Sequence, residues 1–190
     1  MFPNIEERHP GLGEVFSGVF TTQVSPLSNL ATPYPVVQCM LQMAGLRKKD
    51  VLYDLGSGDG RILITAVQQF GVKAVGVELN DSLVRWTISR VERLDFQDKI
   101  HILRTNFFTV DLREADVVTM YLGNEANHLL RPKFEKELRP GTRVVSHHFQ
   151  VEDWEPLEVS TLLVPETGRN HTVYLYRMPQ EARSSTVYRR

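Results

Sequence analysis

The chain has 190 residues, of which 42% are hydrophobic, and its formal net charge at pH 7 is −1. Its length and hydrophobic content suit one domain with one core. A chain this close to neutral has no overall positive field that would draw it onto nucleic acid or an anionic membrane. No stretch approaches the roughly 18 apolar residues needed to cross a bilayer, and the one cysteine, Cys39, fits a reducing compartment. We therefore expect a soluble, cytoplasmic monomer.

Residues 1–31 are expected to form an irregular arm, because proline and glycine recur there and no hydrophobic period is sustained. Residues 35–44 then place apolar side chains at helical spacing, and Gly45 stands where that helix should stop. We predict that the main domain begins at about residue 32.

From residue 51 onward, short apolar runs alternate with helical patterns. The predicted elements are a strand over 51–55, a helix over 61–70, a strand over 74–79, a helix from Asn80 or Asp81 to about 94, strands over 100–103 and 116–122, and a helix over about 125–138. Parallel strands need crossover connections, so this alternation predicts a Rossmann-like, doubly wound α/β sheet.

The last part of the domain follows a different pattern. Three strand-like runs cover residues 142–149, 159–164 and 171–177 with loops but no helix between them, which predicts an antiparallel edge to the sheet. The domain is then expected to end at about residue 178. Residues 179–190 are polar and basic, and we expect a mobile tail.

A glycine-rich loop, Asp54-Leu55-Gly56-Ser57-Gly58-Asp59-Gly60, follows the first predicted strand. In an open α/β sheet, ligands bind beyond the carboxyl ends of the strands, and glycine lets the backbone approach them closely. The spacing here is G-x-G-x-G, whereas dinucleotide-binding loops have G-x-G-x-x-G. Arg61 occupies the position of the third glycine, and the carboxylates of Asp54 and Asp59 would repel a pyrophosphate. These features favour S-adenosyl-L-methionine, which carries an ammonium and a sulfonium, over a dinucleotide.

Residues after the later strands complete the predicted cofactor site. Glu78 ends the second strand about 20 residues beyond the loop, where a carboxylate can accept both ribose hydroxyls, and Leu79 lies beside it. Asn106 follows the third strand and can hydrogen-bond an adenine edge, with Phe107 and Phe108 as an apolar wall. The alternative is that Asn106 is an ordinary loop residue before two core phenylalanines.

The chain closely resembles the small archaeal-type protein-lysine methyltransferases, relatives of the mitochondrial family that methylates a lysine of an ATP synthase subunit. The resemblance extends from about Thr32 to Arg177, on Thr32-Pro33, the glycine loop, Glu78 and its strand, Asn106-Phe107-Phe108, residues 117–122, residues 140–147 and residues 170–176. It implies a class I methyltransferase fold with seven strands, S-adenosyl-L-methionine as methyl donor, protein lysines as acceptors, and Thr32 as a further cofactor residue.

A lysine acceptor must be neutral to attack a methyl group. Its ordinary pKa of about 10.4 makes the neutral form cost roughly 4–5 kcal/mol at pH 7. A cationic sulfonium and an apolar rim would both lower that pKa. We expect Tyr121, Phe149 and Trp154 to form this rim, and Tyr121 to overlook the methyl group; the alternative for Tyr121 is ordinary core packing.

Other chemistries are weighed against this hypothesis. His147, His148 and His171 lack a matching cysteine or carboxylate pattern at ligand spacing, so we expect no metal, although one of them could line the acceptor cleft. The second function to consider is methylation of RNA or a small molecule, with support from the basic tail. The third is a non-catalytic module that binds S-adenosyl-L-methionine. We do not expect nucleic acid as a partner.

Overall fold

The computed structural model describes residues 31–179, so the arm predicted for the N-terminus and almost all of the predicted tail lie outside the described residues. The described elements are α2 Tyr34–Met43, β1 Val51–Leu55, α3 Arg61–Phe70, β2 Lys73–Glu78, α4 Asp81–Arg93, β3 Ile100–Arg104, β4 Val117–Met120, α5 Asn124–Glu137, β5 Arg143–His147, β6 Glu158–Val164 and β7 Arg169–Arg177. No helix in this range is both long enough and apolar enough to span a membrane.

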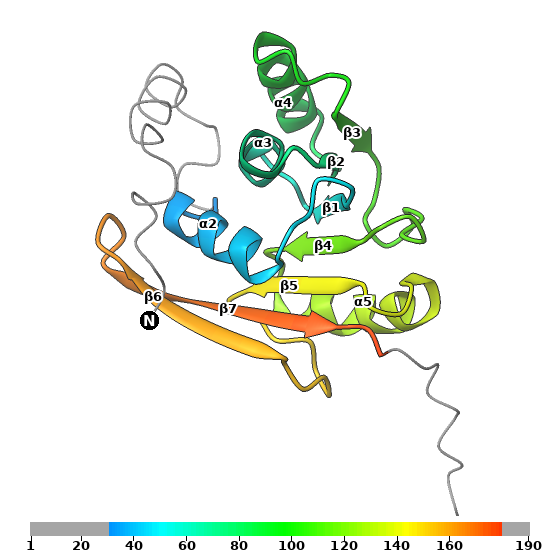
Figure 1. The fold of residues 1–190 in the computed structure, drawn as a ribbon, viewed down its shortest axis with the longest axis vertical. Helices are drawn as coiled ribbons and strands as arrows, with labels where there is room; N and C mark the ends of the chain where they lie inside the picture. The colour runs from blue at the N-terminus through cyan, green and yellow to red at the C-terminus, as the bar shows by residue number, and fades with distance from the viewer. Residues whose placement is uncertain (1–30, 180–190) are drawn as a thin grey trace, which may run out of the picture. The chain divides into compact units, whose positions relative to one another are not determined.

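The strands form one seven-stranded sheet in the order β3-β2-β1-β4-β5-β7-β6 (Figure 1). Strands β1 to β5 pair in parallel, whereas β7 pairs antiparallel with both β5 and β6. The chain builds outward from β1 to β3 and then returns to the other side of β1, so the strand order reverses between β1 and β4. This confirms the predicted doubly wound sheet with an antiparallel C-terminal edge.

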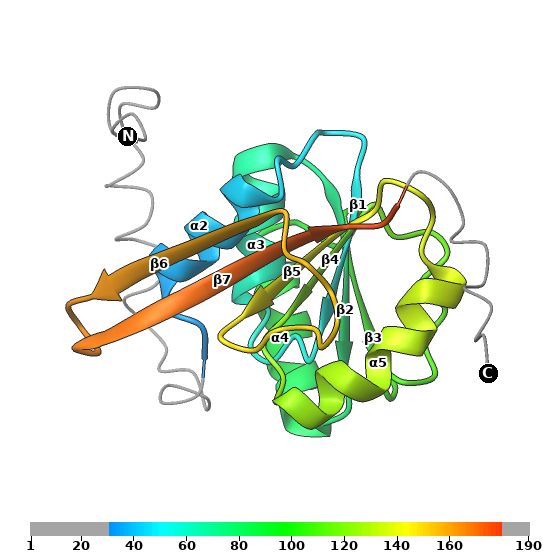
Figure 2. The ribbon, with the colours of Figure 1, turned by 90° about the horizontal axis from the view of Figure 1, so that it is seen from below.

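Helices cover both faces of the sheet, α2, α3 and α4 on one and α5 on the other (Figure 2). Strand β1 shows why, because its buried side chains alternate between two cores. Leu52 packs in the core with α2 and α3, whereas Tyr53 and Leu55 pack in the core with α5. A parallel sheet needs both faces covered, which explains its nearly continuous apolar strands.

The first residues of the helices and the last residues of the parallel strands lie at the edge of the sheet that carries the predicted site. The Asn80 side chain caps α4 by accepting hydrogen bonds from the backbone N–H groups of Ser82 and Leu83, which selects Asn80 over Asp81 as the capping residue. Strand β4 ends at Met120, so Tyr121 stands in the loop beyond it rather than in the strand.

Candidate functional site

The predicted site residues gather at one edge of the sheet. Parallel strands bring their carboxyl ends to the same edge, so the loops after β1, β2, β3, β4 and β5 meet there, beside the reversal of strand order. Strand β7 runs the other way, and its first half therefore reaches the same edge: Val173 pairs with His147, the last residue of β5.

The glycine loop turns tightly over the end of β2. The backbone N–H groups of Gly56 and Ser57 both donate to the carbonyl of Val77, at 2.9 and 3.0 Å. Gly56 has a φ of +75°, and a Cβ there would stand 3.0 Å from the Leu122 side chain. The Ser57 side chain is buried and faces Gly76 of β2, and the Ser57 carbonyl accepts the Gly60 N–H at 2.9 Å, so Ser57 shapes the loop from within.

Glu78 closes the loop from the side of β2. One carboxylate oxygen accepts the Gly58 N–H at 3.0 Å, and the other accepts the N–H groups of Leu79 and Asn80 at 2.9 and 2.8 Å. A carboxylate has about four lone-pair sites, so an acceptor position remains for a ligand hydroxyl. Leu79 is 66% exposed beside it and provides an apolar surface.

Asp54 is buried beneath the loop, where it accepts a hydrogen bond from the Thr119 hydroxyl at 2.8 Å. Burial raises the pKa of Asp54 from 3.8 to about 7; the hydrogen bond from Thr119 opposes this rise, and the nearby Asp59 and Glu78 carboxylates add to it. Asp54 therefore changes its charge near neutral pH, directly under the loop.

Asp54→Asn is expected to remove a pH dependence of stability. The folded protein holds the Asp54 proton up to about pH 7, while the unfolded chain loses it near pH 3.8. Stability from this group is therefore full below pH 4 and is lost as the pH rises through about 7, by up to about 4 kcal/mol. Urea unfolding at pH 4.5 and 7.5 tests this: the variant should gain stability relative to the unmodified protein at the higher pH. Parallel pH profiles for the two proteins would contradict it.

Asp59 does not play the part expected of it. Its carboxylate is buried and binds the Arg61 guanidinium at 2.7 Å, and Arg90 lies 3.9 Å away. These two arginines neutralise the charge of Asp59, so the argument that this charge favours a cationic ligand is wrong. Arg61 also donates to the Thr32 carbonyl at 2.9 Å, and so ties the loop to the segment before α2.

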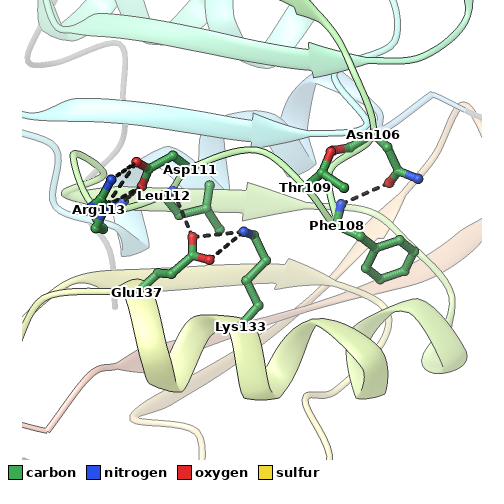
Figure 3. Close-up of polar contacts among 8 residues, drawn as sticks. All are labelled: Asn106, Phe108, Thr109, Asp111, Leu112, Arg113, Lys133 and Glu137. Atoms are coloured by element: carbon green, nitrogen blue, oxygen red, sulfur yellow. Dashed lines mark hydrogen bonds and ion pairs between the residues drawn. The ribbon is translucent and has the colours of Figure 1, made fainter.

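The turn after β3 presents the adenine-binding candidates (Figure 3). The Asn106 side-chain oxygen accepts the Phe108 N–H at 2.9 Å, which leaves the amide nitrogen directed away from the turn. Phe107 packs against the core, whereas Phe108 is 37% exposed. Asn106 thus shapes the turn and can still donate a hydrogen bond.

The same figure shows how helix α5 anchors the connection that follows. Glu137 accepts the Leu112 N–H at 3.1 Å and forms an ion pair with Lys133 at 2.7 Å. The long connection from β3 to β4 is thereby held to α5, which keeps the turn at Asn106 in place without a helix of its own.

Aromatic rings line the edge between β4 and β5. The Tyr121 ring lies 4.1 Å from the His147 ring and 6.1 Å from the Phe149 ring, between centroids, and is stacked on the latter. The Phe149 carbonyl is held by Ser146 and by the Asn127 amide. Tyr121 and Phe149 are therefore together, as the sequence predicted for an apolar rim.

Trp154 is not part of this rim. The segment after β5 folds back along the sheet, so the indole packs against Phe134 and Tyr176 and donates to Glu135. Tyr176 pairs with Val144, near the start of β5. Trp154 thus borders a separate cavity of about 490 Å³, whose lining includes Pro140 and Met178 and which lies toward the amino end of β5. The prediction for Trp154 as an acceptor-site residue is wrong.

His147, His148 and His171, which the sequence offered as residues of which one could line the acceptor cleft, form a cluster. Their candidate ligand atoms lie within 4.8 Å of one another, at metal-binding reach among the described residues. His147 Nε2 and His171 Nδ1 lie 2.9 Å apart in a hydrogen bond, so these two atoms are directed at each other and not at a shared metal position. Both ring nitrogens of His147 and of His171 are also already in hydrogen bonds. This geometry suits hydrogen bonding better than metal coordination.

Comparison with known proteins gives a consistent family. The model of the ANTKMT methyltransferase domain matches residues 54–158. A protein-lysine N-methyltransferase of Saccharolobus islandicus is 51% identical over 146 residues, which are 76% of this chain and 89% of that protein. The adenine nucleotide translocase lysine N-methyltransferase of Mus musculus is 37% identical over 57% of this chain, which spans only 47% of the mouse protein.

A solved structure agrees in fold. The crystal structure of an RNA methyltransferase from Salinibacter ruber in complex with S-adenosyl-L-homocysteine is 40% identical, with a TM-score of 0.75, over 80% of this chain and 95% of that one. The fold, the glycine loop and the sequence relatives thus point to one family, while these relatives are named for different acceptors.

Proposed function

The chain belongs to the ANTKMT methyltransferase domain family, and from this premise we propose that it transfers a methyl group from S-adenosyl-L-methionine to lysine side chains of proteins. The observation that carries the proposal is the 51% identity to a protein-lysine N-methyltransferase of which the chain spans 89%. At this coverage the similarity includes the strands and loops on both sides of the site, not the cofactor loop alone.

The site residues fit this methyl donor. The Glu78 carboxylate would accept a ribose hydroxyl at its remaining acceptor position, exposed Leu79 and Phe108 would pack against the adenine, and the Asn106 amide nitrogen would donate to its edge. The tight turn at Gly56, where a Cβ would meet Leu122, leaves the loop backbone open to close approach. The donor supplies an activated methyl group, and the protein's tasks are to position the amine and exclude water.

Tyr121 and Phe149 would surround the lysine amine with apolar surface. Removing water from a charged ammonium favours its neutral form, so a stacked aromatic rim lowers the lysine pKa toward the working pH. No protein side chain needs to act as a nucleophile, because the neutral lysine amine attacks the methyl group directly.

Tyr121→Ala is expected to lower the rate of methyl transfer at pH 7 about tenfold, which corresponds to one unit of lysine pKa. The loss should shrink as the pH rises, because a larger fraction of the lysine is then neutral without help. Rates measured from pH 7 to 10 test this, with Tyr121→Phe as the control that keeps the ring. A rate and pH profile unchanged in Tyr121→Ala would remove Tyr121 from the mechanism.

The acceptor is tested by incubating the protein with methyl-labelled S-adenosyl-L-methionine and poly-L-lysine, with poly-L-arginine as the matched cationic control. The proposal expects label on lysine nitrogen and none on arginine. Absence of label on poly-L-lysine and on the proteins of a cell extract would refute it, and donor binding without any transfer would instead favour a binding module.

RNA is the second candidate acceptor, favoured by the 40% identity to an RNA methyltransferase. The same labelled donor with total RNA separates the two functions. RNA methylation should weaken steeply with added salt, since phosphate contacts release counterions. The net charge of −1 favours the protein acceptor.

We also propose a reducing, cytoplasmic location, on the support of a sequence with a single cysteine.

A further inference from the structure

Four side chains form a continuous hydrogen-bonded row at the edge of the acceptor site. The Thr32 hydroxyl lies 3.2 Å from His147 Nδ1, His147 Nε2 lies 2.9 Å from His171 Nδ1, and His171 Nε2 lies 3.2 Å from the Thr167 hydroxyl. We call this row the Thr32–Thr167 chain. It joins the segment before α2, the end of β5, the start of β7 and the turn between β6 and β7.

One observation fixes the direction of all three bonds. The Thr167 hydroxyl donates to the Val164 carbonyl at 3.1 Å, so its oxygen must accept from His171 Nε2–H. A neutral His171 then has a bare Nδ1, which accepts from His147 Nε2–H. His147 Nδ1 is therefore also bare and accepts from the Thr32 hydroxyl. Every member donates toward Thr167.

The two ends of the Thr32–Thr167 chain lie in different surroundings. Thr32 is buried, and its carbonyl is held by Arg61 of the cofactor loop. His147 is fully buried under the Tyr121 ring. Thr167, at the other end, is exposed in the β6–β7 turn. The chain thus connects the buried rim of the acceptor site with solvent on the far side of the hairpin.

We propose that the Thr32–Thr167 chain carries to solvent the proton that a lysine ammonium must lose before methyl transfer. This inference rests on the proposed lysine acceptor. An N–H bond of the ammonium breaks as an O–H bond forms at Thr32, whose own proton moves to His147 Nδ1. The Nε2 proton of His147 moves to His171 Nδ1, that of His171 moves to Thr167, and Thr167 releases its proton to water. The products are a neutral amine and a protonated water. After the methylated product leaves and water enters the site, a proton taken up from solvent at Thr167 passes back along the row to that water, which restores the original tautomers.

The electrostatic surroundings suit transfer without storage of charge. Burial, followed by the neighbouring His148 and His171, lowers the pKa of His147 to about 3, so His147 is neutral throughout the working range. Burial first, and then His148 and Arg169, lower the pKa of His171 too. Within residues 31–179, the Tyr121 ring and the Arg61 guanidinium at Thr32 also face the Thr32–Thr167 chain. A chain of neutral groups passes protons along instead of holding one.

The test compares methylation rates of His171→Phe and Thr167→Val with those of the unmodified protein on poly-L-lysine, at saturating donor, from pH 7 to 10. We expect both variants to be about 100-fold or more slower at pH 7, the lower end of what a lost proton-transfer group costs. The deficit should vanish toward pH 10, where free lysine is substantially neutral. Thr167→Ser keeps the hydroxyl and should restore the rate at pH 7.

The matched control is Thr161→Val, which removes a hydroxyl from the same hairpin, where Thr161 pairs with Thr172 outside the chain. Binding of S-adenosyl-L-homocysteine should be equal in all variants. A deficit of the same factor at every pH, or full activity of Thr167→Val at pH 7, would overturn the relay alone. No lysine methylation by the unmodified protein at any pH would overturn the proposed function and the relay with it.

Discussion

Glu78→Ala is expected to weaken binding of S-adenosyl-L-homocysteine about 10- to 100-fold. The Glu78 carboxylate has one acceptor position left for a ribose hydroxyl, and a charge-assisted hydrogen bond there is worth about 1.5–3 kcal/mol, which corresponds to about one to two decades of affinity. The same side chain accepts the Gly58 N–H, so the variant also loses the contact that holds the loop against β2. Isothermal titration calorimetry measures the dissociation constant directly.

Two further variants separate these contributions. Glu78→Gln keeps one oxygen acceptor and should fall between the alanine variant and the unmodified protein. Glu92→Ala removes an exposed carboxylate from α4 and controls for net charge, so its affinity should not change. A dissociation constant within threefold of the original in Glu78→Ala would show that the ribose is bound elsewhere.

The sheet and the cofactor loop were predictable because their signals are local. Each strand is a short apolar run, each turn carries glycine or a capping residue, and a parallel order follows once helices alternate with strands. Glu78 and Asn106 follow the same logic, since a residue at the carboxyl end of a parallel strand must lie at the ligand-binding edge. The resemblance added the number of strands.

The remaining features depend on contacts that no local pattern encodes. Asp59 was expected to face a ligand, but Arg90, 31 positions away, reaches the loop and helps Arg61 to enclose it. Trp154 was misplaced because the path of the segment after β5 is set by packing against α5 and β7.

The histidine cluster shows the same limitation over a longer separation. Thr32 and His147 are 115 positions apart, and they meet only because β5 ends beside the segment that leads into α2. The sequence did carry one signal: His147 and His171 lie in two of the segments on which the family resemblance rests. A sequence pattern therefore predicted that the candidate cofactor residues gather at one edge of the sheet, whereas the neighbours of His147 required the fold.

Gly60→Ala is expected to lower the free energy of unfolding by about 3 kcal/mol. Gly60 has a φ of +75°, which costs an L-residue about 1–2 kcal/mol. A Cβ there would also lie 2.4 Å from Cγ2 of Thr87 on α4, and overpacking costs about 1–3 kcal/mol. Thr87 cannot easily rotate away, because it is β-branched in a helix and its hydroxyl donates to the Gly58 carbonyl at 2.9 Å. The substitution therefore strains the backbone of the loop and also crowds the packing of α4 on it.

Alanine substitutions at two other glycines separate the conformational cost from the crowding cost. All three variants are compared by urea unfolding at fixed pH. Gly45 has a φ of +56° with nothing within 4 Å, so Gly45→Ala carries the conformational cost alone and should lose about 1 kcal/mol. Gly76 lacks the positive φ, but a Cβ there would meet Leu63 at 2.6 Å and Ser57 at 2.8 Å, so Gly76→Ala isolates crowding. If Gly60→Ala were no more destabilising than Gly45→Ala, the Thr87 side chain would have to move aside with little loss of folding free energy. The close packing of α4 on the cofactor loop would then not be what requires glycine at position 60.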